Sequence, residues 1–117
     1  MNLNIERTKN IGRIFFGSLF LISAIHSLFF EFHEFAKLIE SKHIPFPFLI
    51  AFIVLIFKLI SGILIISNNY KNYILTLLMI FVLMATILYH NIFVDMSQFN
   101  NMTKNIAIIG GLMLLYK

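Results

Sequence analysis

The sequence predicts an all-α fold: an integral membrane four-helix bundle with a short fourth helix and an amphipathic interfacial segment between the first two helices. The composition is the first reason, since 60% of the 117 residues are hydrophobic, 12% are charged and the mean hydropathy is +0.92. Soluble domains are usually about 45–50% apolar and about 25% charged. The second reason is that the apolar residues form long segments without the alternation typical of strands. Helices are therefore expected, because lipid cannot satisfy exposed backbone amides.

Four helices are expected within a single domain of residues 1–117, at about 11–30, 45–67, 73–94 and 103–116. About 20 helical residues cross a bilayer, since each residue rises about 1.5 Å, and the first three segments meet this length. The fourth is shorter, so it either spans a locally thinned bilayer or packs against its neighbours without fully crossing. The first helix is expected to be retained rather than cleaved as a signal peptide, because no clear cleavage site follows it.

The linker between the first two helices, residues 31–44, is polar and amphipathic. Its apolar residues recur at helical spacing: Phe32, Phe35, Leu38 and Ile39. This pattern predicts a short helix that lies at the membrane interface. Pro45 and Pro47 are expected to end this helix and to start the next one, since proline disfavours helical geometry in the preceding residue and suits the first turn of a helix.

The Lys and Arg residues near the helix ends predict the orientation. One side of the membrane is expected to carry five of them: Arg7, Lys9, Arg13, Lys71 and Lys117. The other side carries three, which are offset by acidic residues: Lys37, Lys42 and Lys104. Because cytoplasmic loops carry an excess of positive charge, both termini are expected in the cytoplasm.

The composition also excludes several classes of function. Cysteine is absent, which excludes disulfides, thiolate metal sites and dithiol redox chemistry on this chain. The net charge of +4 is modest and scattered, so no nucleic-acid partner is expected. No metal site is expected either. The chain has no nucleotide-binding loop, so redox chemistry would need a cofactor or a partner.

Polar side chains inside the expected helices form a candidate pocket. Its members are His26, Lys58, Thr86, His90 and Asn91. Ionisable groups in hydrocarbon cost about 2.5–3.5 kcal/mol each on insertion scales, so each one needs a reason. His26 and His90 lie at similar depth, roughly 6 Å inside the outer boundary, because each precedes the end of its helix by about four residues. Thr86 and His90 continue a stripe that is expected to face into the bundle and begins with Thr76, Met79 and Leu83.

Several readings of these ionisable residues stay open. Lys58 can lose its proton on burial, extend its stem towards the cytoplasmic side, hydrogen-bond to serine and backbone groups, or contact a ligand. The histidines can bond to backbone carbonyls or water, or share a polar pocket. Two histidines at equal depth also suggest haem ligation, which is disfavoured because it requires the rings to face each other. Zinc is disfavoured further, since no third ligand is evident.

Small residues let helices approach closely in membranes, and their spacing predicts helix contacts. The positions expected to serve helix packing are Gly17, Ser61, Gly62, Ala107, Gly110 and Gly111.

Landmarks occur in order along the chain: Arg13 with Gly17 and Phe20, the Pro-x-Pro of residues 44–47, Gly62, residues 85–91, and residues 104–112. With these landmarks the chain resembles the DoxX family of small bacterial four-helix membrane proteins across nearly its whole length. His90 and Asn91 match the family motif position by position. Typical members carry a Gly followed by a Lys near the end of the first helix, where this chain has Ala24 and Ser27. They also carry a Glu in the second helix, where this chain has Lys58.

The resemblance implies a redox-associated function in the bacterial inner membrane. Some relatives are subunits of thiosulfate:quinone oxidoreductase, and others are linked to redox and thiol-stress complexes. The expected function is therefore an accessory or quinone-linked subunit of a membrane redox complex, with lipid and a membrane or peripheral redox protein as partners. A non-catalytic scaffold or assembly factor is the alternative. A small transporter is less favoured, because four short helices leave little room for a pathway unless copies of the chain associate.

Overall fold

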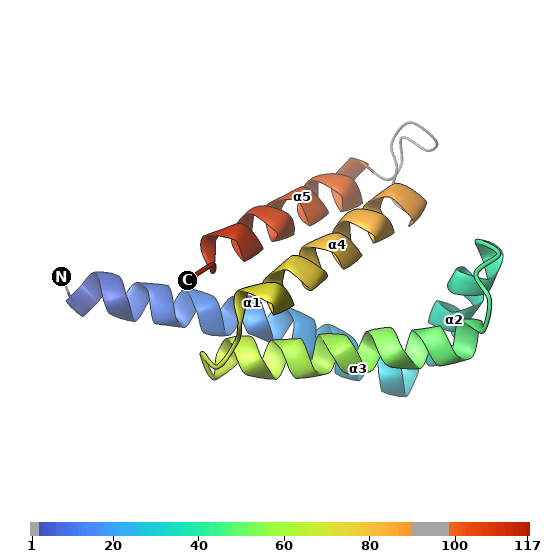
Figure 1. Ribbon diagram of the computed structural model, residues 1–117, viewed down its shortest axis with the longest axis horizontal. Coiled ribbons are helices and arrows are strands. Elements are labelled where there is room, and N and C mark those ends of the chain that lie inside the picture. The colour runs from blue at the N-terminus through green and yellow to red at the C-terminus, as the bar shows by residue number, and fades with distance from the viewer. Residues whose placement is uncertain (1–2, 90–98) are drawn as a thin grey trace. The chain divides into compact units, whose positions relative to one another are not determined.

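The computed structural model describes residues 3–89 and 99–117, which form five helices (Figure 1). These are α1 (Leu3–Phe30), α2 (Phe32–Ser41), α3 (Pro47–Ile66), α4 (Asn72–Tyr89) and α5 (Phe99–Leu114). The all-α prediction is confirmed for this part of the chain. The chain folds as two compact units, residues 1–70 and 71–117. A four-helix bundle would require these two units to pack together, and it stays a prediction.

Helix α1 is longer at its start than the sequence predicts. It begins at Leu3, about two turns before the expected start near residue 11. The added residues are polar but contain neither Gly nor Pro, and side chains such as Glu6, Arg7 and Lys9 suit a helix. Hydropathy marks where the apolar segment begins, and the backbone continues its hydrogen bonds beyond that boundary.

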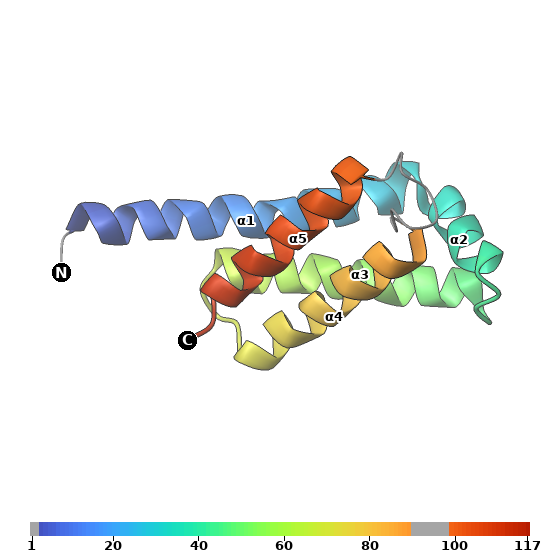
Figure 2. The ribbon, with the colours of Figure 1, turned by 90° about the horizontal axis from the view of Figure 1, so that it is seen from above.

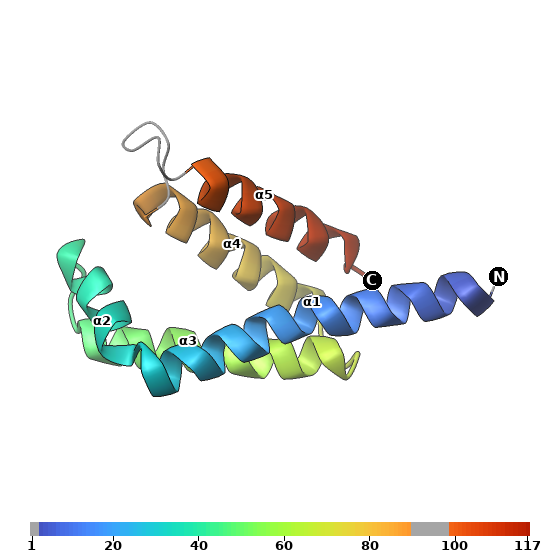
Figure 3. The ribbon, with the colours of Figure 1, turned by 180° about the vertical axis from the view of Figure 1, so that it is seen from behind.

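The first unit is built on an antiparallel pair, α1 and α3, which lie side by side in all three ribbon views (Figures 1, 2 and 3). The two backbones meet at Gly17 and Gly62. A Cβ atom added to Gly62 would lie 2.9 Å from the Gly17 carbonyl oxygen, and one added to Gly17 would lie 3.1 Å from the Gly62 carbonyl oxygen. Any side chain larger than hydrogen would therefore push these helices apart.

The amphipathic linker does form a helix, α2, which lies at the end of the pair where α1 finishes and α3 begins (Figure 2). Its buried residues Ala36 and Ile39 pack with Ala51 of α3. Leu38, which the spacing placed on the same apolar face, is exposed. Packing on α3 therefore covers part of the face that was expected to lie in the membrane interface. The location of α2 at that interface stays a prediction.

The turn into α3 is conformationally strained. Phe46 lies between two prolines and adopts the left-handed region at φ 53°, which is unusual for a bulky residue. The helix begins at Pro47 rather than Pro45, and this proline occupies its first turn, where no backbone N–H is needed.

The second unit is the antiparallel pair of α4 and α5 (Figure 3). The buried face of α4 consists of Leu75, Leu78, Val82 and Thr86. Among the residues of the predicted inward stripe, Thr86 is buried whereas Thr76 and Leu83 are exposed, and the direction of the stripe within a bundle stays a prediction. The buried residues of α4 thus lie about one position before those of the predicted stripe, and three of the four are apolar.

The expected packing face of α5 also differs from the structure. Ala107 is exposed, Gly111 is only half-buried, and a Cβ atom added to Gly110 would meet open space. The buried residues of this helix are instead Asn105 and Leu112. They are seven positions apart, close to two helical turns, so they lie on one face. Within the second unit, the buried face of α5 is therefore formed by Asn105 and Leu112, and a packing role for its small residues stays a prediction.

Two of the described helices are long and apolar enough to cross a membrane: residues 4–30 within α1 and Pro47–Ile66 of α3. Residues 72–87 of α4 form a shorter apolar helix. Large apolar side chains are exposed on the long helices, including Phe15 at 73% and Ile53 at 56%. Helices that face lipid have this arrangement, since their outer surface needs no polar coat.

Candidate functional site

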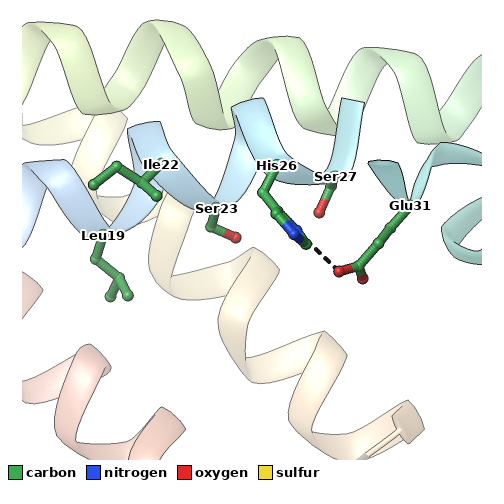
Figure 4. Close-up of a pocket in the computed structure, with 6 residues that line it drawn as sticks. All are labelled: Leu19, Ile22, Ser23, His26, Ser27 and Glu31. Atoms are coloured by element: carbon green, nitrogen blue, oxygen red, sulfur yellow. Dashed lines mark ion pairs between the residues drawn. The ribbon is translucent and has the colours of Figure 1, made fainter. Parts of the chain in front are cut away.

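Polar side chains gather on one face of α1 and line an open pocket of about 470 Å³ (Figure 4). The lining residues are Leu19, Ile22, Ser23, His26, Ser27 and Glu31. The residues from α1 recur at intervals of three and four positions, which places them on one side of a helix. The pocket therefore combines an apolar end with a polar end on a helix of membrane-spanning length.

The polar end is organised by a contact between His26 and Glu31. The Nδ1 atom of His26 lies 2.9 Å from Oε1 of Glu31, and Figure 4 shows the two side chains pointing toward one another. Glu31 is the residue between α1 and α2, and its backbone N–H donates to the Ser27 carbonyl oxygen at 3.1 Å. This bond turns Glu31 back over the end of α1. Both side chains are more than half exposed, so the pair contributes little to stability.

Lys58 reaches the same face of α1 from the opposite helix. Its Nζ atom donates a hydrogen bond to Oγ of Ser23, at 2.9 Å, and the side chain is half-buried. Ser23 lies one turn before His26. Of the arrangements considered for Lys58, the structure shows the hydrogen bond to serine. Lys58 is therefore bonded to Ser23, one of the residues that line the pocket with His26.

The remaining members of the predicted pocket are Thr86, His90 and Asn91. Thr86 belongs to the second unit. His90 and Asn91 lie outside the described residues, so the equal depth of the two histidines stays a prediction, as does the expectation that they do not ligate haem. In residues 3–89 and 99–117, no group of three or more His, Cys, Asp or Glu side chains could hold a metal ion.

Thr86 forms a buried polar contact with Asn105, which sequence reasoning missed. Its hydroxyl donates to the Val82 carbonyl oxygen at 2.8 Å and accepts from Nδ2 of Asn105 at 3.0 Å. Helix α5 begins about one turn before the predicted position of 103, and Asn105 is one of its buried residues. A side chain that hydrogen-bonds between apolar helices sets their register.

Arg13 is a second residue whose role the sequence did not predict. Its Nε donates to the carbonyl oxygen of Ile65 at 3.0 Å, and its Nη2 reaches that of Ile66 at 3.4 Å. These carbonyls lie in the last turn of α3, where a cation is favourable, and that of Ile65 also accepts from the backbone N–H of Asn68 at 3.1 Å. The four-residue spacing from Gly17 is the signal that could have placed Arg13 on the packed face of α1.

Tyr70 lies buried in the turn after α3. Burial raises the pKa of its hydroxyl, and the nearby Arg13 guanidinium lowers this pKa by a smaller amount. The net effect is a raised pKa. The uncharged form of the hydroxyl is therefore favoured at this end of the first unit.

Ser61 stands beside the Gly17–Gly62 crossing and is fully buried. Its hydroxyl makes no hydrogen bond within the described part of the chain. Its small size suits the close contact between α1 and α3, but a buried hydroxyl without a partner costs about 1–3 kcal/mol. Packing therefore accounts for Ser61 better than hydrogen bonding does.

A comparison with family models matches residues 9–91 to the DoxX family. This range contains the described residues that line the pocket, as well as Lys58 and the Gly17–Gly62 crossing. Searches of curated proteins and of solved structures gave no match to the chain.

Proposed function

Because this chain belongs to the DoxX family of membrane-associated proteins, we propose that it is a multi-pass protein of the bacterial inner membrane and an accessory, quinone-linked subunit of a redox complex. Both termini lie in the cytoplasm in this proposal. The observation that carries it is the polar pocket on α1, which is reached by Lys58 of α3.

The lining residues suit a quinone head group. Binding sites for small molecules are mostly apolar and contain a few placed polar groups. Leu19 and Ile22 supply an apolar surface, while Ser23, His26 and Lys58 place polar atoms at the other end of the pocket. Hydroxyl and amine groups can donate hydrogen bonds to quinone carbonyl oxygens. The apolar tail of such a ligand would extend into lipid along the exposed face of α1.

The accessory role follows from the chemistry of the whole chain. A quinone needs electrons from a donor, and this sequence contains no cysteine to carry a thiol couple or an iron–sulfur cluster. The electrons would therefore come from a partner subunit that holds its own redox group. The membrane protein then supplies binding and orientation.

Quinone binding by the purified full-length chain in lipid nanodiscs tests the proposal. We expect a short-chain benzoquinone to bind the native protein, and Lys58→Met to weaken binding by about tenfold, because it removes a polar contact while keeping a long apolar side chain. Lys104→Met is the matched control. Lys104 lies exposed on α5, so this change is expected to leave binding within twofold.

Two outcomes would contradict this function. Failure of the native protein to bind any quinone would remove the quinone link. If the chain bound no quinone but co-purified with a specific partner, and that partner lost activity when the chain was deleted, the scaffold function would be favoured instead. Equal binding by the native protein and Lys58→Met would place the quinone away from this pocket.

A further inference from the structure

The contact between Glu31 and His26 determines which atom of the imidazole faces a ligand. An ionised carboxylate only accepts hydrogen bonds. The Nδ1 atom of His26 lies 2.9 Å from Oε1 of Glu31, so a proton on Nδ1 is what makes this contact attractive. The tautomer of a histidine is set in this way by the partner of one ring nitrogen.

The other ring nitrogen, Nε2, is left to interact with a ligand in the pocket. In the neutral ring, Nδ1 holds the single proton, so Nε2 presents a lone pair and accepts hydrogen bonds. One turn away, the hydroxyl of Ser23 accepts from Lys58 and keeps its own proton to donate. The polar end of the pocket thus offers an acceptor and a donor on neighbouring turns of α1.

We infer that this pocket selects the hydroxyl-bearing, reduced form of an aromatic carrier, a hydroquinone, and that Glu31 is the positioning residue that creates this selectivity. A hydroquinone hydroxyl can donate to Nε2 of His26 and accept from Ser23. A quinone carbonyl can only accept, so it would face the lone pair of Nε2 without a hydrogen bond. The choice of a quinone-type ligand rests on the proposed function, whereas the tautomer of His26 does not.

The tautomer is tested first, by nitrogen NMR of the full-length chain in nanodiscs at about pH 8, where histidine side chains ordinarily carry no charge. We expect the His26 signals, assigned by their loss in His26→Asn, to show a proton on Nδ1. Glu31→Ala is expected to abolish this preference. Glu34→Ala is the control, because Glu34 is an exposed carboxylate on α2 outside the pocket lining, and it should leave the signals unchanged. A proton on Nε2 in the native protein would overturn the inference.

Ligand selectivity is tested second, with a short-chain hydroquinone kept reduced and with the corresponding benzoquinone. We expect the native protein to bind the hydroquinone about tenfold more tightly, the size of one net hydrogen bond. Glu31→Ala should reduce this ratio to about one, and Glu34→Ala should keep it. Binding of both forms with equal affinity by the native protein would overturn the selectivity and leave the proposed function intact. Binding of neither form would contradict both.

Discussion

Lys58 shows how a charged residue is tolerated in an otherwise apolar helix. An ionisable group in a membrane costs about 2.5–3.5 kcal/mol on insertion scales, and the hydrogen bond to Ser23 offsets part of this cost. The family pattern places a cation on the first helix and an acid on the second. In this chain the cation is on α3 and its partner is a hydroxyl on α1. The polar link between these two helices is present, with the charge on the opposite helix.

The buried contact between Thr86 and Asn105 is expected to contribute modestly to stability. A double-mutant cycle of Thr86→Val and Asn105→Leu should give a coupling free energy of about 0.6 kcal/mol and at most about 1.7 kcal/mol, as for other hydrogen bonds between membrane helices. Denaturant unfolding in detergent measures it. The control cycle pairs Thr103→Val with Asn105→Leu. In the described part of the chain, the Thr103 hydroxyl donates to the carbonyl oxygens of Phe99 and Asn100, both within α5. That cycle should show no coupling, and equal couplings would contradict the assignment.

Tyr70 makes stability depend on pH at the alkaline end. Burial raises the pKa of Tyr70 above the ordinary 10.0, so the folded chain holds this proton more tightly than the unfolded chain does. The stabilisation is complete below pH 10 and is lost as pH rises from there through the folded pKa. Arg13→Ala removes a charge that favours the phenolate, so we expect the pKa of Tyr70 to rise further.

The tyrosinate absorbance, taken as the difference from the matching Tyr70→Phe variant, measures this change. Because the chain has four tyrosines, the difference isolates Tyr70. A fall in the pKa of Tyr70 in Arg13→Ala would contradict the expectation. It would show that Arg13 acts mainly by keeping the hydroxyl buried.

At the scale of elements, two sets of contacts along the helix axes hold α1 against α3. Gly17 and Gly62 allow the backbones to touch, and one turn away Arg13 binds the carbonyl oxygens at the end of α3. The glycines determine how closely the helices approach, while Arg13 determines how far one helix slides along the other. The polar face that lines the pocket depends on both, because Ser23 meets Lys58 only in this register.

Alanine at the two crossing glycines is expected to act unequally. A Cβ atom at Gly62 would lie 2.8 Å from the backbone nitrogen of Leu21, whereas the nearest atom to one at Gly17 is the flexible side chain of Ile66, also at 2.8 Å. We therefore expect Gly62→Ala to destabilise the chain by about 1–3 kcal/mol and Gly17→Ala to cost less. Thermal unfolding in nanodiscs compares the two.

The controls for this comparison are Gly12→Ala and Gly110→Ala. An added Cβ atom at either position would meet nothing within 4 Å. Alanine is the better helix former by about 1 kcal/mol, so both controls should be neutral or stabilising. Destabilisation by Gly110→Ala would reveal a contact of α5 with another molecule or with the first unit.

At the scale of the whole molecule, the absence of cysteine allows a direct test of topology. Single cysteines are introduced at Ser41, at the end of α2, at Asn69, in the turn between α3 and α4, and at Asn100, in the first turn of α5. A membrane-impermeant maleimide on intact spheroplasts should label Ser41→Cys and Asn100→Cys. It should label Asn69→Cys only after lysis, because the proposed orientation, based on the positive charges, has this turn in the cytoplasm.

Labelling at Asn100→Cys separates two arrangements. If α4 crosses the membrane, as the four-helix proposal requires, this position is reached from outside. If only α1 and α3 cross, it reacts only after lysis. Labelling of Asn69→Cys in intact spheroplasts would instead reverse the proposed orientation.

The sequence predicts the helices well and their faces poorly. The expected segments correspond to α1, α3, α4 and α5, and most of the helix ends that the structure describes lie within a few residues of the predicted ones. The linker forms α2. Of the residues expected to share a pocket, His26 and Lys58 reach the same face of α1. Thr86 pairs with Asn105 in the other unit, and the pairing of His26 with Glu31 was not predicted.

The physical reason lies in the composition. An apolar segment without strand alternation can only be a helix in lipid, so the sequence by itself determined the secondary structure, and its ordered landmarks determined the family. In such a chain both the buried and the exposed faces of a helix are apolar, so the hydrophobic pattern does not specify its rotation. Only the tertiary structure decided that rotation, through the contact of two glycines, the hydrogen bonds of Arg13, Lys58 and Asn105, and the turn that directs Glu31 toward His26.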